Sequence, residues 1–133
     1  MPKKILIVED DLAFYNLCST ELKLRGYNTV HVPNGDIAVS RIREEKPNLI
    51  LLDIILPGIN GLDILKELKE AEETSDIAVI MLTNFGTDEN ISKAVELGAD
   101  DYLMKYNLVP SELPEKLAPY LGEQSESGVT LTG

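Results

Sequence analysis

The chain has 133 residues, a length that suits one domain and is too short for two full ones. Hydrophobic residues make up 44% of it and aromatic residues only 5%, so aliphatic side chains must fill the core. The net charge of −11 argues against nucleic-acid and membrane partners, because both are anionic. The single cysteine, Cys18, excludes an intramolecular disulfide, and no apolar run approaches the ~20 residues that span a bilayer. We therefore expect a cytoplasmic protein that binds neither nucleic acid nor membrane.

Short aliphatic runs alternate with amphipathic stretches along the chain. The aliphatic runs predict five strands, at residues 5–8, 27–32, 49–53, 77–82 and 101–104. A helix is expected after each strand, with these apolar side chains on its inward face: Phe14, Leu17, Cys18 and Leu22; Ala38 and Ile42; Leu62, Leu65 and Leu68; Ile91, Ala94 and Val95; and Leu113, Leu117 and Leu121. Asp11 suits the cap of the first helix, while Gly26, Pro47 and Gly98 mark helix ends.

Five strand–helix units in this order predict an α/β fold with a doubly wound parallel sheet. Strands that are covered on both faces form continuous apolar runs, as residues 49–53 do, and right-handed crossovers place helices on both faces. We assign residues 1–122 to this one domain. Residues 123–133 are polar and lack an apolar period, so we expect a disordered tail there.

Polar side chains follow four of the five predicted strands. The first strand leads into the acids Glu9, Asp10 and Asp11, and the third ends in Asp53. The fourth leads into Thr83 and Asn84, and the fifth into Lys105. Ligands of open α/β sheets bind beyond the carboxyl ends of the strands. We therefore expect these side chains to meet in one crevice.

Clustered carboxylates repel one another unless a cation lies among them. Mg²⁺ satisfies that need, because it favours a few carboxylates together with water and substrate oxygens. Lys105 and Thr83 suit the oxygens of a phosphate, and a carboxylate can itself form an aspartyl phosphate. Each residue also has an ordinary explanation, since acids often match a helix dipole and a lysine is often only solvated. Their joint position at four strand ends favours a Mg²⁺ crevice that suits phosphate.

Five segments match a known family in order and spacing: ILIVEDD (5–11), LLDIILPG (51–58), NG (60–61), MLT (81–83) and GADDYLMK (98–105). Through these segments, the chain resembles the receiver domain of bacterial response regulators, the CheY-like family, over about residues 3–121. The resemblance implies a flavodoxin-like sheet with strand order 2-1-3-4-5. It also implies a phosphoprotein of two-component signal transduction, which takes part only in its own phosphorylation and dephosphorylation and is not otherwise an enzyme.

The resemblance implies that Asp53 is the phosphoacceptor. Its donor would be the phosphohistidine of a histidine kinase or of a histidine phosphotransfer protein. Asp10 and Asp53 would bind Mg²⁺ directly, together with the backbone carbonyl of Ile55. Glu9 would act on the ion through water.

The resemblance also implies how the domain responds to phosphorylation. Thr83 and Lys105 would hold the phosphoryl oxygens, and Tyr102 would turn inward as Thr83 moves toward the phosphate. From the residues alone, a half-buried aromatic on an edge strand is the preferred explanation of Tyr102. The fourth helix, fifth strand and fifth helix would form the face for a partner or a homodimer. Pro114 suits a first helical turn, but Pro119 should weaken the end of the last helix, so this face is expected to be unusual.

The residues around the expected site depart from the family pattern. Asn84 stands where a small residue is usual, and its side chain could narrow access to the phosphoacceptor. Tyr106 replaces the proline that usually follows Lys105, so a trans peptide bond is expected there. Ile55 and Phe85 occupy the two positions that tune dephosphorylation in the family. Because both are apolar and neither can align an attacking water, we expect a long-lived phosphoryl group.

Other interpretations are open. The chain could be a stand-alone receiver or a receiver from a longer protein. A Mg²⁺-dependent phosphohydrolase with an aspartyl-phosphate intermediate would usually carry an acid/base aspartate two residues after the nucleophile, where this sequence has Ile55. A flavodoxin-like electron carrier would need a phosphate-binding loop after the first strand, where Glu9, Asp10 and Asp11 would repel the FMN phosphate.

Overall fold

The computed structural model describes residues 2–84 and 88–123, which contain one five-stranded sheet. The strands are β1 (Lys4–Val8), β2 (Asn28–Val32), β3 (Leu49–Asp53), β4 (Ala78–Thr83) and β5 (Asp101–Met104). They lie in the order β2-β1-β3-β4-β5, and every pairing is parallel. The predicted fold class and strand order are therefore confirmed.

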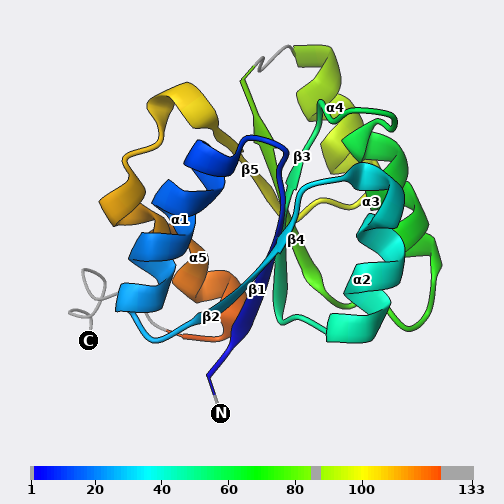
Figure 1. The fold of residues 1–133 in the computed structure, drawn as a ribbon. Helices are drawn as coiled ribbons and strands as arrows, with labels where there is room; N and C mark the ends of the chain where they lie inside the picture. The colour runs from blue at the N-terminus through cyan, green and yellow to red at the C-terminus, as the bar shows by residue number, and fades with distance from the viewer. Residues whose placement is uncertain (1, 85–87, 124–133) are drawn as a thin grey trace, which may run out of the picture.

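Helices cover both faces of this sheet (Figure 1). One face carries α1 (Leu12–Leu24) and α5 (Leu113–Leu117), and the other carries α2 (Ala38–Glu45), α3 (Gly61–Glu70) and α4 (Asp88–Glu96). Short 3-10 segments join them: η1 (Gly35–Ile37), η2 (Lys105–Asn107), η3 (Pro110–Glu112) and η4 (Ala118–Leu121). In the part of the chain that the structure describes, no helix has the length and apolar character needed to cross a membrane.

The core has two halves, one on each face of the sheet. Side chains alternate between the faces of a strand, so Leu6 and Val8 pack with α2 and α3, whereas Ile5 and Ile7 pack with α1 and α5. All four are fully buried. The same alternation places Asp53, at the end of β3, on the side of α1 and α5, as Leu51 is.

Two apolar side chains that were predicted to face inward are exposed. Leu17 on α1 is 54% exposed and Val95 on α4 is 62% exposed. Each is adjacent in sequence to a buried residue, Cys18 or Ala94, and consecutive helical residues point about 100° apart. A helix that packs on a sheet buries one stripe, so the prediction was wrong for these two positions. The other inward positions are buried or half-buried, as predicted.

Local signals at the helix ends act as predicted. The Asp11 carboxylate caps α1 by accepting a hydrogen bond from the backbone N–H of Phe14 at 3.2 Å. Pro114 lies in the first turn of α5, and α5 gives way to 3-10 structure at η4, where Pro119 lies. The α-helix thus ends two residues before Pro119. Of the expected tail, only Glu123 falls within the described residues.

Candidate functional site

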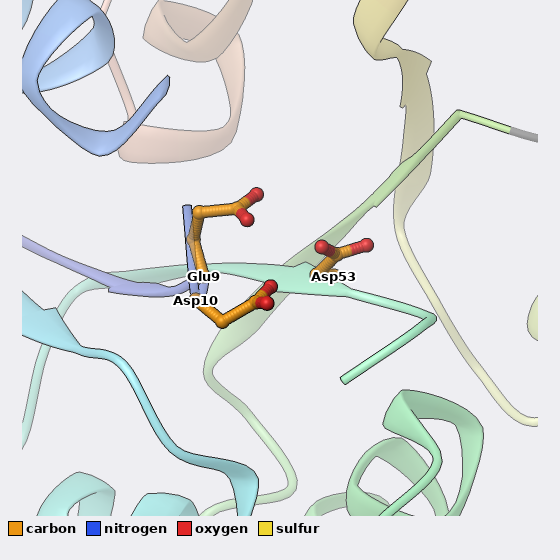
Figure 2. Close-up of side chains that lie close together, drawn as sticks. All are labelled: Glu9, Asp10 and Asp53. Atoms are coloured by element: carbon orange, nitrogen blue, oxygen red, sulfur yellow. The ribbon is translucent and has the colours of Figure 1, made fainter. Parts of the chain in front are cut away.

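Three carboxylates meet at the carboxyl end of the sheet. Glu9 and Asp10 follow β1, and Asp53 ends the neighbouring strand, β3. Figure 2 shows that the three side chains point toward a common space. One oxygen of each carboxylate lies within 4.8 Å of an oxygen from each of the other two. The expected meeting of these acids is therefore observed.

The acids line a crevice of about 230 Å³ together with residues from the adjoining loops: Glu9, Asp10, Asp11, Asp53, Ile55, Asn84 and Lys105. Glu9 is fully buried and Asp53 is 4% exposed, whereas Asp10 faces solvent. The carboxylates thus extend from the interior of the domain to its surface. A small cation or a phosphate could reach them from solvent.

Lys105 brings a positive charge to the buried acids. Its ammonium Nζ donates a hydrogen bond to Asp53 Oδ2 at 2.8 Å and forms an ion pair with Glu9 Oε1. The Phe14 ring of α1 lies beside the same ammonium, with 4.9 Å from Nζ to the ring centroid. A cation over an aromatic face is attracted to the ring electrons. Lys105 is therefore held by two carboxylates and one ring.

Burial decides the direction of the pKa shift of the two buried acids in the crevice. It raises the pKa of Glu9 to about 7, although the hydrogen bonds from Lys105 and from the Asp11 backbone act in the opposite direction. Burial also raises the pKa of Asp53, against the lowering effect of Lys105. For Lys105 itself, burial lowers the pKa, but the hydrogen bonds to Asp53 and Glu9 outweigh it, so its pKa is raised. One ammonium thus compensates two buried carboxylates incompletely, which favours an additional cation.

The backbone around Asp53 is tightly packed. The N–H of Ile55 donates to Asp53 Oδ1 at 3.4 Å, and the N–H of Gly61 donates to the Ile54 carbonyl at 2.7 Å. A Cβ atom on Gly61 would lie 1.9 Å from the Asp53 carbonyl oxygen. Only glycine lets the start of α3 approach the end of β3 this closely. The approach positions the loop that carries Ile55.

Of the other predicted residues, Asn84 and Ile55 line the crevice, whereas Thr83 and Tyr102 do not. Thr83 ends β4, is fully buried and does not line the crevice, whereas its exposed neighbour Asn84 does. Tyr102 of β5 is partly exposed and lines a separate hollow of about 140 Å³ beside α5. Ile55 is 57% exposed at the rim of the crevice. Phe85 lies outside the described residues.

Three residues contact this site that the sequence did not single out for it: Phe14 beside Lys105, His31 on the Glu9 backbone and Gly61 against Asp53. Gly61 belongs to a recognised segment, so its place in the motif was a usable signal. Phe14 carried no such signal, because an apolar residue on a helix is most simply explained as core. His31 was detectable only as the single histidine of the chain.

Comparisons with known proteins agree with this geometry. The family model for the response regulator receiver domain matches residues 5–118. The phosphate regulon transcriptional regulatory protein PhoB of Pseudomonas aeruginosa is 40% identical over 119 residues, which cover 90% of this chain and 52% of PhoB. The chain thus spans about half the length of the curated relatives that it matches.

Solved structures give the same result. A CheY-like receiver domain protein from Methanospirillum hungatei matches with a TM-score of 0.85 and 32% identity, covering 96% of this chain and 100% of its own. The BeF3-activated N-terminal receiver domain of RstA from Klebsiella pneumoniae matches with a TM-score of 0.81 and 34% identity, covering 90% and 98%, respectively. The chain therefore belongs to the response regulator receiver domain family, whose members are signalling domains of two-component phosphorelays.

Proposed function

We propose that Asp53 accepts a phosphoryl group from a phosphohistidine of a histidine kinase or histidine phosphotransfer protein. The observation that carries the proposal is the contact of its carboxylate with Lys105 inside a crevice that three further acids, Glu9, Asp10 and Asp11, also line. In the transfer, a carboxylate oxygen of Asp53 attacks phosphorus and the bond from phosphorus to the histidine nitrogen breaks. The electron pair of that bond stays on the imidazole, so the step needs no oxidant or reductant.

Glu9, Asp10 and Asp53 fit Mg²⁺, because they offer only oxygen ligands and lie within 4.8 Å of one another. We propose that Asp10, Asp53 and the carbonyl of Ile55 hold the ion directly and that Glu9 acts through water. When bound, Mg²⁺ supplies positive charge that neutralises the carboxylates and the phosphoryl oxygens. The raised pKa of Glu9 and Asp53 supports a site that gains from such a charge.

Lys105 is suited to hold a phosphoryl oxygen after the transfer, because its ammonium already lies 2.8 Å from Asp53 Oδ2. Thr83, buried at the end of β4, would donate its hydroxyl to a second phosphoryl oxygen. The modification adds about −1.5 to −2 charges and three strong acceptors, which draw both donors toward Asp53. Tyr102 would respond from β5, and the face of α4, β5 and α5 would bind the downstream partner or a second copy.

We propose that the phosphoryl group is long-lived. Ile55 lies at the rim of the crevice and offers no group that can align a water molecule for attack. Asn84 lines the crevice, and we propose that its amide narrows the route to Asp53. Loss of phosphate within seconds from the purified protein would contradict this proposal.

The proposed domain comprises residues 1–122, since Leu121 is still buried against the core. The prediction that the protein has no nucleic-acid partner is not supported by its curated relatives. PhoB, of which the match covers 52%, is named a transcriptional regulatory protein. We propose that the receiver controls partners through its surface, and that any contact with nucleic acid belongs to a further domain. The phosphohydrolase alternative is not favoured by the family match.

The experiment is incubation with Mg²⁺ and acetyl phosphate, followed by intact mass measurement. We expect the protein to gain one phosphoryl group and Asp53→Asn to gain none. Asp76→Asn, which changes an exposed acid that does not line the crevice, should behave as the wild type does. Chelation of the metal with EDTA should prevent the gain. Equal gain in the wild type and in Asp53→Asn would exclude Asp53 as the acceptor.

A further inference from the structure

His31 contacts the backbone at the edge of the acidic crevice. It lies on β2, paired with Ile7 of β1, and its Nε2 is 2.8 Å from the carbonyl oxygen of Glu9. A carbonyl oxygen can only accept a hydrogen bond, so Nε2 must carry the proton that is shared. The contact therefore selects ring forms of His31 that are protonated at Nε2.

The Glu9 carbonyl belongs to the peptide group that joins Glu9 to Asp10. On the other side of Glu9, its backbone N–H donates to the Val32 carbonyl at 3.1 Å. β2 ends at Val32 and Pro33 follows, so the His31 side chain provides a hydrogen bond just beyond the end of the strand ladder. The backbone N–H and the backbone carbonyl of Glu9 are therefore both hydrogen-bonded to residues of β2.

The imidazole ring is itself held in place. It stacks on the Tyr15 ring of α1, with 4.0 Å between the centroids and 13° between the planes. The Tyr15 hydroxyl is hydrogen-bonded to the Thr29 hydroxyl at 3.0 Å, which joins α1 to β2 at the same place. The ring is half-buried, so it has little room to turn away from Glu9.

We propose that His31 is a positioning residue that orients the Glu9–Asp10 peptide and, through it, the Asp10 carboxylate. The inference rests on the proposed function, because it concerns Asp10 as a metal ligand. The Glu9 carboxylate is fixed by the Asp11 N–H at 2.9 Å and by Lys105. Asp10 is exposed, so packing does not hold its side chain, and the observed constraint nearby is the hydrogen bond on the peptide that precedes it. Groups that orient metal ligands in this way contribute strongly to metal affinity.

The test compares two replacements of His31 by isothermal titration with Mg²⁺. Phenylalanine keeps the stack on Tyr15 and removes the donor, so His31→Phe should bind Mg²⁺ about tenfold more weakly, at the lower end of such effects. Glutamine can present an amide donor near the position of Nε2, so His31→Gln should recover most of the affinity.

Ser19→Ala is the matched control. Ser19 is buried, and its hydroxyl is hydrogen-bonded at 2.8 Å to the Thr29 hydroxyl, which also bonds to Tyr15. It should lose stability but keep the wild-type affinity for Mg²⁺. Unchanged affinity in His31→Phe, or an equal loss in His31→Gln and His31→Phe, would overturn a role for the hydrogen bond.

A second measurement does not depend on the variants or on the metal. Nitrogen-15 spectra of the imidazole in the metal-free protein should show Nε2 protonated and its proton protected from exchange. Neutral His31 protonated only at Nδ1 would overturn the proposal. Failure of the wild type to gain phosphate would count against the proposed function alone, because the Mg²⁺ titrations and the spectra test His31 separately.

Discussion

The two ends of the sheet carry ion pairs in different surroundings. At the carboxyl end, Lys105 contacts Asp53 and Glu9, and none of these side chains is more than 10% exposed. At the amino end, Lys4 of β1 contacts Glu45 of α2 at 2.9 Å, and Arg41 reaches the same carboxylate at 3.1 Å. There, each side chain keeps 27–34% of its surface exposed.

Ion pairs at the two ends of the sheet have different consequences for the pKa of their carboxylates. The hydrogen bonds from Lys4 and Arg41 lower the pKa of Glu45, so its charge is favoured in the folded state. In the crevice, burial raises the pKa of Glu9 and Asp53 in spite of Lys105. The amino end uses charge to join β1 to α2. The carboxyl end keeps buried carboxylates that one ammonium compensates incompletely, so an added cation would stabilise it.

The largest expected effect is that of Gly61→Ala at the carboxyl end. Its Cβ would lie 1.9 Å from the Asp53 carbonyl oxygen, so α3 must shift away from β3. We expect the free energy of unfolding to fall by about 3 kcal/mol, measured by denaturant titration.

Gly122→Ala is the control for that effect. Gly122 has φ of 75°, but among the described residues other than its chain neighbours no atom lies within 4 Å of an added Cβ, so only backbone strain of about 1 kcal/mol is expected. Equal losses in the two variants would show that the close approach to Asp53 is unimportant.

Lys105→Met should have the next largest effect. It leaves Glu9 and Asp53 buried without their cation, and we expect a loss of about 2 kcal/mol at pH 8 without metal, less than for a completely buried pair. Mg²⁺ should then raise the unfolding temperature more than it does in the wild type, because it replaces the missing charge. If Lys105→Met had wild-type stability both without metal and with Mg²⁺, Lys105 would not stabilise the buried carboxylates.

Phe14 should contribute less, through its contact with the Lys105 ammonium. A double-mutant cycle of Phe14→Leu with Lys105→Met should give a coupling energy of about 0.5–1 kcal/mol in chemical denaturation. The cycle separates the ring–cation contact from the packing that Phe14→Leu also changes. Additive effects of the two substitutions would show that the ring does not stabilise the ammonium.

The smallest effect is expected at the amino end. Lys4→Met should lower the free energy of unfolding by less than about 1 kcal/mol, because the pair is partly solvated. High salt should reduce the loss further, since exposed charges are screened. If Lys4→Met lowered the free energy of unfolding as much as Lys105→Met does, burial would not explain a difference between the ion pairs at the two ends of the sheet.

Much of the fold could be predicted because its signals are local. Continuous apolar runs marked the buried strands, and β3 was located at residues 49–53 from its pattern alone. Asp11 marked the start of α1, and Pro119 lies where α-helix has given way to 3-10 structure. The inward positions were less certain, as Leu17 and Val95 show, because the pattern of a helix does not reveal how wide a stripe its neighbours cover.

The sequence by itself determined the order of the elements, the family and the meeting of Glu9, Asp10 and Asp53, because parallel strands deliver their last residues to one edge of the sheet. Only the tertiary structure decided which of these acids is buried and which contacts Lys105. It also decided that His31 reaches the Glu9 backbone. Burial and hydrogen bonding depend on distances between segments that are far apart in the chain, and no local pattern encodes those distances.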